Sequence, residues 1–181
     1  MTEYYLAVDI GASSGRHILG HMEQGRMVME EMHRFYNGLT VKDGEACWDL
    51  EQLFEEIKTG LKKCREAGKI PVSMGIDTWA VDFVLLDDTD KVLGNAVGYR
   101  DKRTEGTDRL VYEVLPEQEL YGRTGIQKQI FNTIYQLMAV KKNIRNVWKR
   151  HLPCSWCPTI SSFCSQAERR LSTPMPPQPS L

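Results

Sequence analysis

Small and polar residues between two apolar runs near the N-terminus suit the binding of a phosphate group. Asp9 ends the run Tyr4–Val8, and the residues that follow are Ile10, Gly11, Ala12, Ser13, Ser14, Gly15 and Arg16. Glycine and alanine let backbone N–H groups approach an anion, and serine hydroxyls add donors. The carboxylate of Asp9 can hold Mg²⁺ directly or through water. The segment therefore predicts a phosphate-binding hairpin, although an ordinary tight turn has a similar composition.

Three strands are expected to position this segment. Residues 4–9, 16–22 and 26–35 read as strands, and Gln24-Gly25 is typical of a tight turn between the second and third. Three consecutive strands joined by hairpins form an antiparallel meander.

A long helix and several shorter elements are expected to follow. Asp49 is a good N-cap with Gln52 three residues later, and Gly68 suits the end of the helix. Apolar residues recur at helical spacing between them: Leu50, Leu53, Phe54, Ile57, Leu61 and Cys64. Strands are expected at 72–76 and 81–86, extended chain at 91–98, and helices at 104–114, 116–122 and 130–140. The last helix would bury Ile130, Ile134, Leu137 and Met138 on one face.

This order of elements indicates an α/β fold. Three strands, a helix, a strand and then more helices, with a phosphate-type loop in the first hairpin, match the ribonuclease-H-like or actin-like ATPase domain. The expected mixed sheet begins with the three-stranded antiparallel meander and is flanked by helices. A fold assigned by pattern does not by itself give a function.

Composition restricts the class of protein. A net charge of −1 over 181 residues argues against a nucleic-acid partner. No apolar run is long enough to span a membrane, and Glu3 and Asp9 interrupt any signal-peptide pattern. Five cysteines without a secretion signal favour reduced thiols and a cytoplasmic location.

Residues 4–142 resemble the N-terminal domain of FGGY carbohydrate kinases, which transfer the γ-phosphate of ATP to a sugar hydroxyl. The matching segments, in chain order, are Ala7–Arg16, His33–Phe35, Asn37–Leu39, Trp48-Asp49, Gly75–Leu86, Tyr99–Arg103, Tyr121–Gln127 and Phe131–Leu137. The resemblance implies ATP, Mg²⁺ and a small sugar as ligands, with no nucleic acid or membrane partner. It does not indicate an oligomeric state.

The resemblance also implies roles for individual residues. Asp9 would lie near Mg²⁺ and the phosphates, and the segment Ala12, Ser13, Ser14, Gly15 and Arg16 would contact ATP. Ala80 would line the sugar pocket, where the family often has glycine. Asp82 and Arg100 either bind sugar hydroxyls or form structural contacts, and both alternatives stay open. The family's general base is an aspartate of a second domain, so no residue here receives a catalytic role, and we expect this chain alone to be inactive as a kinase.

The last 39 residues have a different composition. Residues 1–142 carry 18 basic and 23 acidic residues, whereas 143–181 carry five basic residues and a single acidic one, together with six of the eight prolines. Cys154 and Cys157 form a C-x-x-C pair, but the context of a zinc or redox site is missing. We therefore expect two segments, an incomplete kinase domain over 1–142 and a disordered tail over 143–181.

A frameshift explains this tail. If each original codon joined the last base of one present codon to the first two of the next, Trp156-Cys157 forces valine, Phe163-Cys164 forces leucine and Met175-Pro176 forces alanine. The alternative frame permits strings that resemble the kinase family, such as V-P-D-Y-F and E-Y-T-N-A-T-T-T-Q-L. Other hypotheses stay open: a binding module without transfer activity, another ATPase of the same superfold, or a faulty gene sequence without a stable product.

Overall fold

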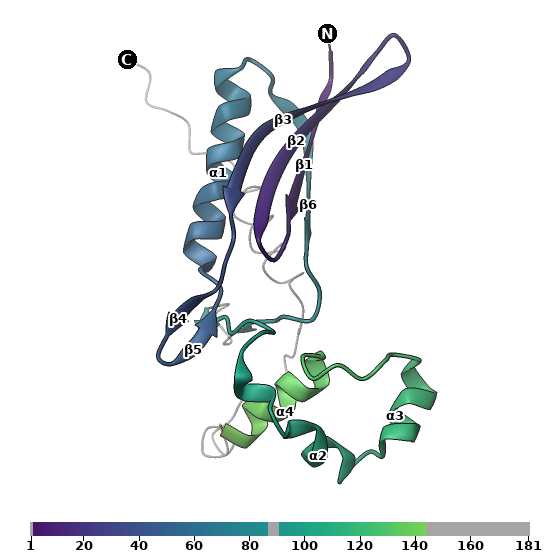
Figure 1. Ribbon diagram of the computed structural model, residues 1–181. Coiled ribbons are helices and arrows are strands. Elements are labelled where there is room, and N and C mark those ends of the chain that lie inside the picture. The colour runs from purple at the N-terminus through teal and green to yellow at the C-terminus, as the bar shows by residue number, and fades with distance from the viewer. Residues whose placement is uncertain (1, 87–90, 144–181) are drawn as a thin grey trace.

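A four-stranded mixed sheet is the centre of the structure. The computed structural model describes residues 2–86 and 91–143. The strand order is β3-β2-β1-β6. β1 (Tyr4–Ile10), β2 (Ser14–Glu23) and β3 (Arg26–Tyr36) are antiparallel neighbours, and β6 (Pro71–Thr78) runs parallel to β1. The predicted meander and mixed sheet are confirmed (Figure 1).

The turn between β2 and β3 consists of Gln24 and Gly25, as predicted. Their φ angles are 49° and 76°, and two-residue hairpins favour such positive angles because the turn then matches the twist of the strands. Beside the turn the ladder pairs Glu23 with Arg26. The register of β2 and β3 is thus set at this end.

One helix, α1 (Leu50–Glu66), covers one face of the sheet (Figure 1). It begins where the backbone N–H of Gln52 donates to the Asp49 carboxylate at 2.9 Å, and Gly68 follows its end with a φ of 68°. The buried core joins side chains of α1 to those of β1, β2 and β3: Leu6, Val8, Ile10, Leu19, Phe35, Leu53, Ile57 and Cys64. Because each large apolar side chain contributes about 1.5–3 kcal/mol when buried, this layer fixes β1 and β2 and the loop between them.

His17 is a polar member of this interface. Its side chain is fully buried, and neither ring nitrogen has a hydrogen-bond partner among the described residues. A Cβ atom on Gly60 of α1 would lie 2.2 Å from the His17 ring, so glycine lets the helix approach the sheet here. Burial, helped by the nearby His33, lowers the pKa of His17 to about 4.

Beyond the carboxyl ends of β1 and β6, the chain continues into short elements (Figure 1). Two small hairpins pair β4 (Thr40–Lys42) with β5 (Glu45–Cys47) and β7 (Leu85–Leu86) with β8 (Val92–Leu93). The helical elements are η1 (Lys102–Thr104), α2 (Thr107–Tyr112), α3 (Glu117–Thr124) and α4 (Thr133–Asn143). The predicted helix at 104–114 is thus divided between η1 and α2.

The strand and the last helix expected in this region differ from the prediction in their bounds, and the helix also differs in its buried face. The strand expected at 81–86 reduces to Leu85–Leu86, because Val81 adopts a φ of 72°, which no strand allows. The helix expected at 130–140 begins at Thr133, after Ile130. Its buried residues are Tyr135, Gln136, Ala139 and Val140, because α4 packs on α2 and η1 with this face.

No helix in the described parts of the chain is long and apolar enough to cross a membrane. The tail from residue 144 on, with its C-x-x-C pair and the frameshift hypothesis, lies outside the described residues.

Candidate nucleotide and sugar site

The loop between β1 and β2 is closed by its own backbone and by Asn37. The N–H of Gly11 donates to the carbonyl of Ser14 at 2.9 Å. The side chain of Asn37 donates to the Gly11 carbonyl at 2.7 Å, and its backbone N–H donates to the Ser13 carbonyl at 3.1 Å. Asn37 is only 4% exposed. The sequence pattern missed this bracing role, because Asn37 lies 26 residues from its partner and only the fold brings them together.

The same loop leaves backbone donors free. Among the described residues, the N–H groups of Ala12 and Ser13 have no hydrogen-bond partner, whereas those of Gly11 and Asn37 are used to close the loop. Unpaired N–H groups in a tight turn make a concavity that attracts anions. This arrangement can therefore receive a phosphate group.

Gly15 serves packing. A Cβ atom at this position would lie 2.1 Å from the ring of Phe35, which is buried in the core. Glycine is required here because the Phe35 ring occupies the space that a side chain would need. The family resemblance implies in addition that Gly15 contacts ATP. That contact stays a prediction.

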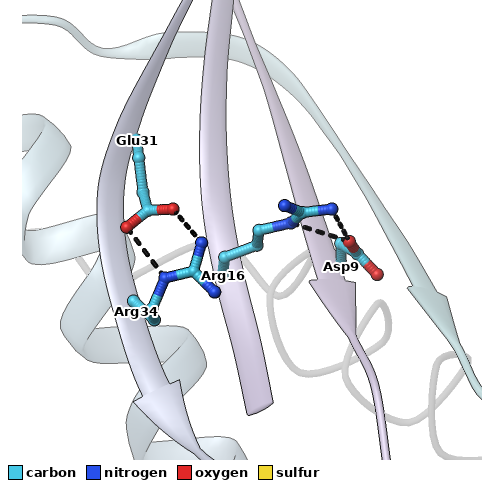
Figure 2. A network of polar contacts seen from close by, with 4 residues as sticks. All are labelled: Asp9, Arg16, Glu31 and Arg34. Atoms are coloured by element: carbon cyan, nitrogen blue, oxygen red, sulfur yellow. Dashed lines mark hydrogen bonds and ion pairs between the residues drawn. The ribbon is translucent and has the colours of Figure 1, made fainter.

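A row of charged residues crosses the face of the sheet that α1 leaves uncovered. The strand registers place Asp77 beside Asp9, Asp9 beside Arg16, and Arg16 beside Arg34. Figure 2 shows Arg16 reaching the Asp9 carboxylate, while Arg34 pairs with Glu31 on its own strand. Two negative residues and two positive ones are thus aligned next to the loop.

The Asp9–Arg16 pair is an exposed ion pair. Arg16 Nε and Nη2 both contact Asp9 Oδ2, at 2.9 and 2.8 Å. The side chains are 45% and 47% exposed, so solvent screens the pair and it stabilises the fold by about 0–1 kcal/mol. Both charges can therefore change partners at little cost when a ligand arrives.

Asp9 supplies part of what a magnesium site requires. No cluster of three or more histidine, cysteine, aspartate or glutamate side chains suited to a metal occurs among the residues described. Asp77 is the neighbouring carboxylate on the sheet. Mg²⁺ is commonly held by one or two carboxylates with water and phosphate oxygens completing its shell, so such a sparse donor set suits a metal that arrives with a nucleotide.

Asp82 is buried and its carboxylate is fully engaged. Its Oδ2 accepts hydrogen bonds from the indole N–H groups of Trp48 at 2.6 Å and Trp79 at 2.8 Å, and its Oδ1 accepts one from Gln136 at 3.2 Å. The side chain is 6% exposed. The cavity beside it is apolar and about 30 Å³, which has room for a water molecule but not for a sugar.

Val81 has a strained backbone at the same turn. A β-branched residue with a φ of 72° is an outlier that costs about 1–3 kcal/mol. Its carbonyl accepts hydrogen bonds from Thr133 Oγ1 at 2.8 Å and Gln136 Nε2 at 3.1 Å, both on α4. A larger cavity of about 660 Å³ opens between α3 and α4, with Val81 and Thr133 in its wall.

Ala80 and Arg100 are the other two predicted sugar residues, and both are exposed. Ala80 precedes Val81 in the strained turn. Arg100 donates from Nε to the hydroxyl of Tyr99 at 3.1 Å, and its guanidinium lies over the Tyr99 ring. Asp82 and Arg100 thus bind different partners and do not pair with each other.

The neighbouring Asp101 and Arg103 are structural. The Asp101 carboxylate accepts from the backbone of Arg103 and of Ala46, which ties η1 to β5. Arg103 donates to Gln136 Oε1 at 2.8 Å, and burial lowers the pKa of its guanidinium. Arg103 therefore orients Gln136 toward Asp82 and Val81.

Comparison with known proteins defines the class of this fold and site. The N-terminal domain model of the FGGY family of carbohydrate kinases matches residues 4–157. The chain therefore belongs to the FGGY family. The match extends past Lys142, the predicted end of the kinase domain, and that boundary stays a prediction.

The relatives with high identity are rhamnulokinases. The one from Halalkalibacterium halodurans is 59% identical over 147 residues, which make up 81% of this chain and 31% of that protein. The one from Oceanobacillus iheyensis is 50% identical over 143 residues, 79% of this chain and 30% of that protein. The chain thus spans about a third of the length of these relatives.

Solved structures confirm the fold. Gluconate kinase from Lactobacillus acidophilus matches with a TM-score of 0.66, 18% identity, and coverage of 82% of this chain and 30% of that one. Xylulose kinase from the same organism has a TM-score of 0.64, 18% identity, and coverage of 81% and 30%. These kinases have the actin-like ATPase fold that the element order predicted.

Proposed function

We propose that this chain supplies the phosphate-binding half of an ATP-dependent sugar kinase whose substrate is L-rhamnulose and whose product is L-rhamnulose 1-phosphate. The observation that carries the proposal is the braced loop Gly11–Ser14, with its free N–H groups, beside the Asp9–Arg16 pair. The identity to rhamnulokinases supports the choice of sugar. A cytoplasmic location remains part of the prediction.

Nucleotide binding would use the charges of this face. The N–H groups of Ala12 and Ser13 and the hydroxyls of Ser13 and Ser14 would donate to phosphate oxygens. Arg16 would leave Asp9 and contact a phosphate, and Asp9, with Asp77 beside it, would hold Mg²⁺ directly or through water. When bound, the metal supplies charge neutralisation on the phosphates.

The sugar would approach at the exposed Ala80 and at Arg100. The burial of Asp82 and its three hydrogen bonds favour its structural alternative over contact with sugar hydroxyls. Arg100 is exposed, and its guanidinium packs on the Tyr99 ring. Among the described residues, its remaining N–H groups are free to donate to a sugar hydroxyl. Phosphoryl transfer would also require a general base, which we assign to no residue of this chain.

Calorimetric titration of the chain with Mg-ATP tests the nucleotide half of the proposal. We expect saturable binding that Asp9→Asn weakens at least tenfold, while Arg34→Gln, a charge loss one strand further away, changes it less than twofold. Equal affinity for Mg-ATP in the wild-type chain and Asp9→Asn would contradict the proposed site.

Titration with L-rhamnulose and a coupled assay for ADP test the other half. We expect sugar binding without turnover. Turnover by this chain alone would overturn the assignment of the general base to another part of the enzyme. A second candidate, a kinase domain for another ketose or deoxy sugar, is favoured if such a sugar binds and L-rhamnulose does not.

A further inference from the structure

We infer that Gln136 on α4 is a positioning residue for the sugar-facing turn Trp79–Asp82, which it holds in its left-handed conformation through two contacts. This inference rests on the proposed function, because it assumes that the turn faces the sugar. Gln136 itself lies inside the molecule and is 0% exposed, so it acts on a ligand only through the turn.

The contacts of Gln136 converge on consecutive residues. Its Nε2 donates to the carbonyl of Val81 at 3.1 Å and to the carboxylate of Asp82 at 3.2 Å. It also donates to the carbonyl of Phe131 at 2.9 Å, at the start of the segment that leads into α4. One amide group thus joins the turn to the helix.

The orientation of this amide is set by Arg103. Its Nη2 donates to Gln136 Oε1 at 2.8 Å, so the oxygen faces the guanidinium and the nitrogen faces the turn. A glutamate in place of Gln136 would keep the contact with Arg103 but would place an acceptor against Val81 and Asp82. Only an amide can accept from Arg103 and also donate to Val81 and Asp82.

The turn needs such support because its conformation is unfavourable. Val81 is the only residue among those described that is both β-branched and at positive φ, and its carbonyl takes donors from both Gln136 and Thr133. A strained backbone conformation persists only where contacts with several neighbouring groups hold it in place. Asp82, fixed by two indoles and Gln136, anchors the other end of the turn.

This geometry predicts a local effect of Gln136→Leu. We expect hydrogen exchange of the Trp48 and Trp79 indole N–H groups, which donate to Asp82 at 2.6 and 2.8 Å, to accelerate at least tenfold, with less than a twofold change for the β1 amides of Leu6 and Val8. The matched control is Gln129→Leu, at an exposed glutamine before α4, and it should leave exchange unchanged. Thr133→Val, which removes one donor to Val81 without changing shape, should give a smaller acceleration and provides the test if Gln136→Leu does not fold.

A rescue experiment separates positioning from general packing. Glycine adopts positive φ without strain, so Val81→Gly in the Gln136→Leu background should recover part of the lost protection of the Trp48 and Trp79 indole N–H groups. Unchanged exchange in both Gln136→Leu and Thr133→Val, or acceleration spread evenly over the chain, would overturn the inference.

Ligand binding completes the test. We expect Gln136→Leu to weaken L-rhamnulose binding at least tenfold and Mg-ATP binding less than twofold. Wild-type sugar affinity in this variant would overturn the positioning role. If the wild-type chain binds no sugar, the sugar half of the proposed function fails, and the exchange experiment still decides whether Gln136 holds the turn.

Discussion

The side chain of Asn37 donates to the carbonyl of Gly11 at 2.7 Å and closes the proposed phosphate loop from outside the β1–β2 hairpin. The backbone N–H of Asn37 binds Ser13 as well, so one buried residue holds two points of the loop. The loop is therefore preformed, and ligand binding does not include the entropic cost of ordering it.

Replacing Asn37 by alanine should loosen the loop. We expect a loss of about 1–3 kcal/mol of unfolding free energy, because the half-buried Gly11 carbonyl loses its side-chain donor. Mg-ATP affinity should fall about tenfold. Chemical denaturation and calorimetric titration measure the two effects, and full nucleotide affinity in a folded Asn37→Ala variant would show that the loop does not bind phosphate.

Arg16→Gln should weaken Mg-ATP binding while leaving the stability of the fold nearly unchanged. Because the Asp9–Arg16 pair is exposed, its loss should change the free energy of unfolding by less than about 1 kcal/mol. The loss of a cation that would contact phosphate should weaken Mg-ATP binding tenfold or more. Arg34→Gln is the matched control, and equal losses of affinity in the two variants would argue against a specific role for Arg16.

Gly15→Ala should destabilise the fold. The added Cβ would overlap the ring of Phe35, and overpacking of this kind costs about 1–3 kcal/mol. The second change Phe35→Leu should restore part of the loss by making room. Denaturant unfolding of the single and double variants measures this coupling, and additive effects would contradict the packing role of Gly15.

Stability should fall with pH below neutrality because of His17. Its pKa is about 4 in the folded chain against an ordinary value near 6.5, so the unfolded chain binds the proton first as the pH decreases. The contribution is complete above pH 6.5 and is lost progressively down to pH 4, by about 3 kcal/mol in all.

The replacement His17→Leu should remove this part of the pH dependence. Unfolding free energies of the wild-type chain and the variant, measured between pH 7 and 4, should differ by an amount that changes with pH. A constant difference over that range would show that His17 does not stay neutral in the folded chain.

Local patterns in the sequence predicted the sheet and its first helix. The turn Gln24-Gly25, the cap at Asp49 and the apolar spacing from Leu53 to Cys64 are local signals, because neighbouring residues set backbone angles and the face that is buried. The proposed phosphate loop was predicted in the same way, from residue types within one hairpin.

Local sequence patterns did not predict the short elements after β6. Val81 belongs to an apolar run that predicts a strand, yet Thr133 and Gln136, more than 50 residues later, hold its carbonyl in a left-handed turn. The buried face of α4 was also set by its contacts with α2 and η1 rather than by the hydrophobicity of the helix.

The sequence by itself determined the strand order of the meander, the capped helix and the family, because these depend on residues close together in the chain or on ordered matches along it. Only the tertiary structure showed that Asn37 braces the loop and that Asp82 is buried and accepts hydrogen bonds from Trp48, Trp79 and Gln136. The physical reason is that hydrogen bonds and burial depend on distances in space. Partners that lie 26 to 55 residues apart leave no local pattern from which those distances can be read.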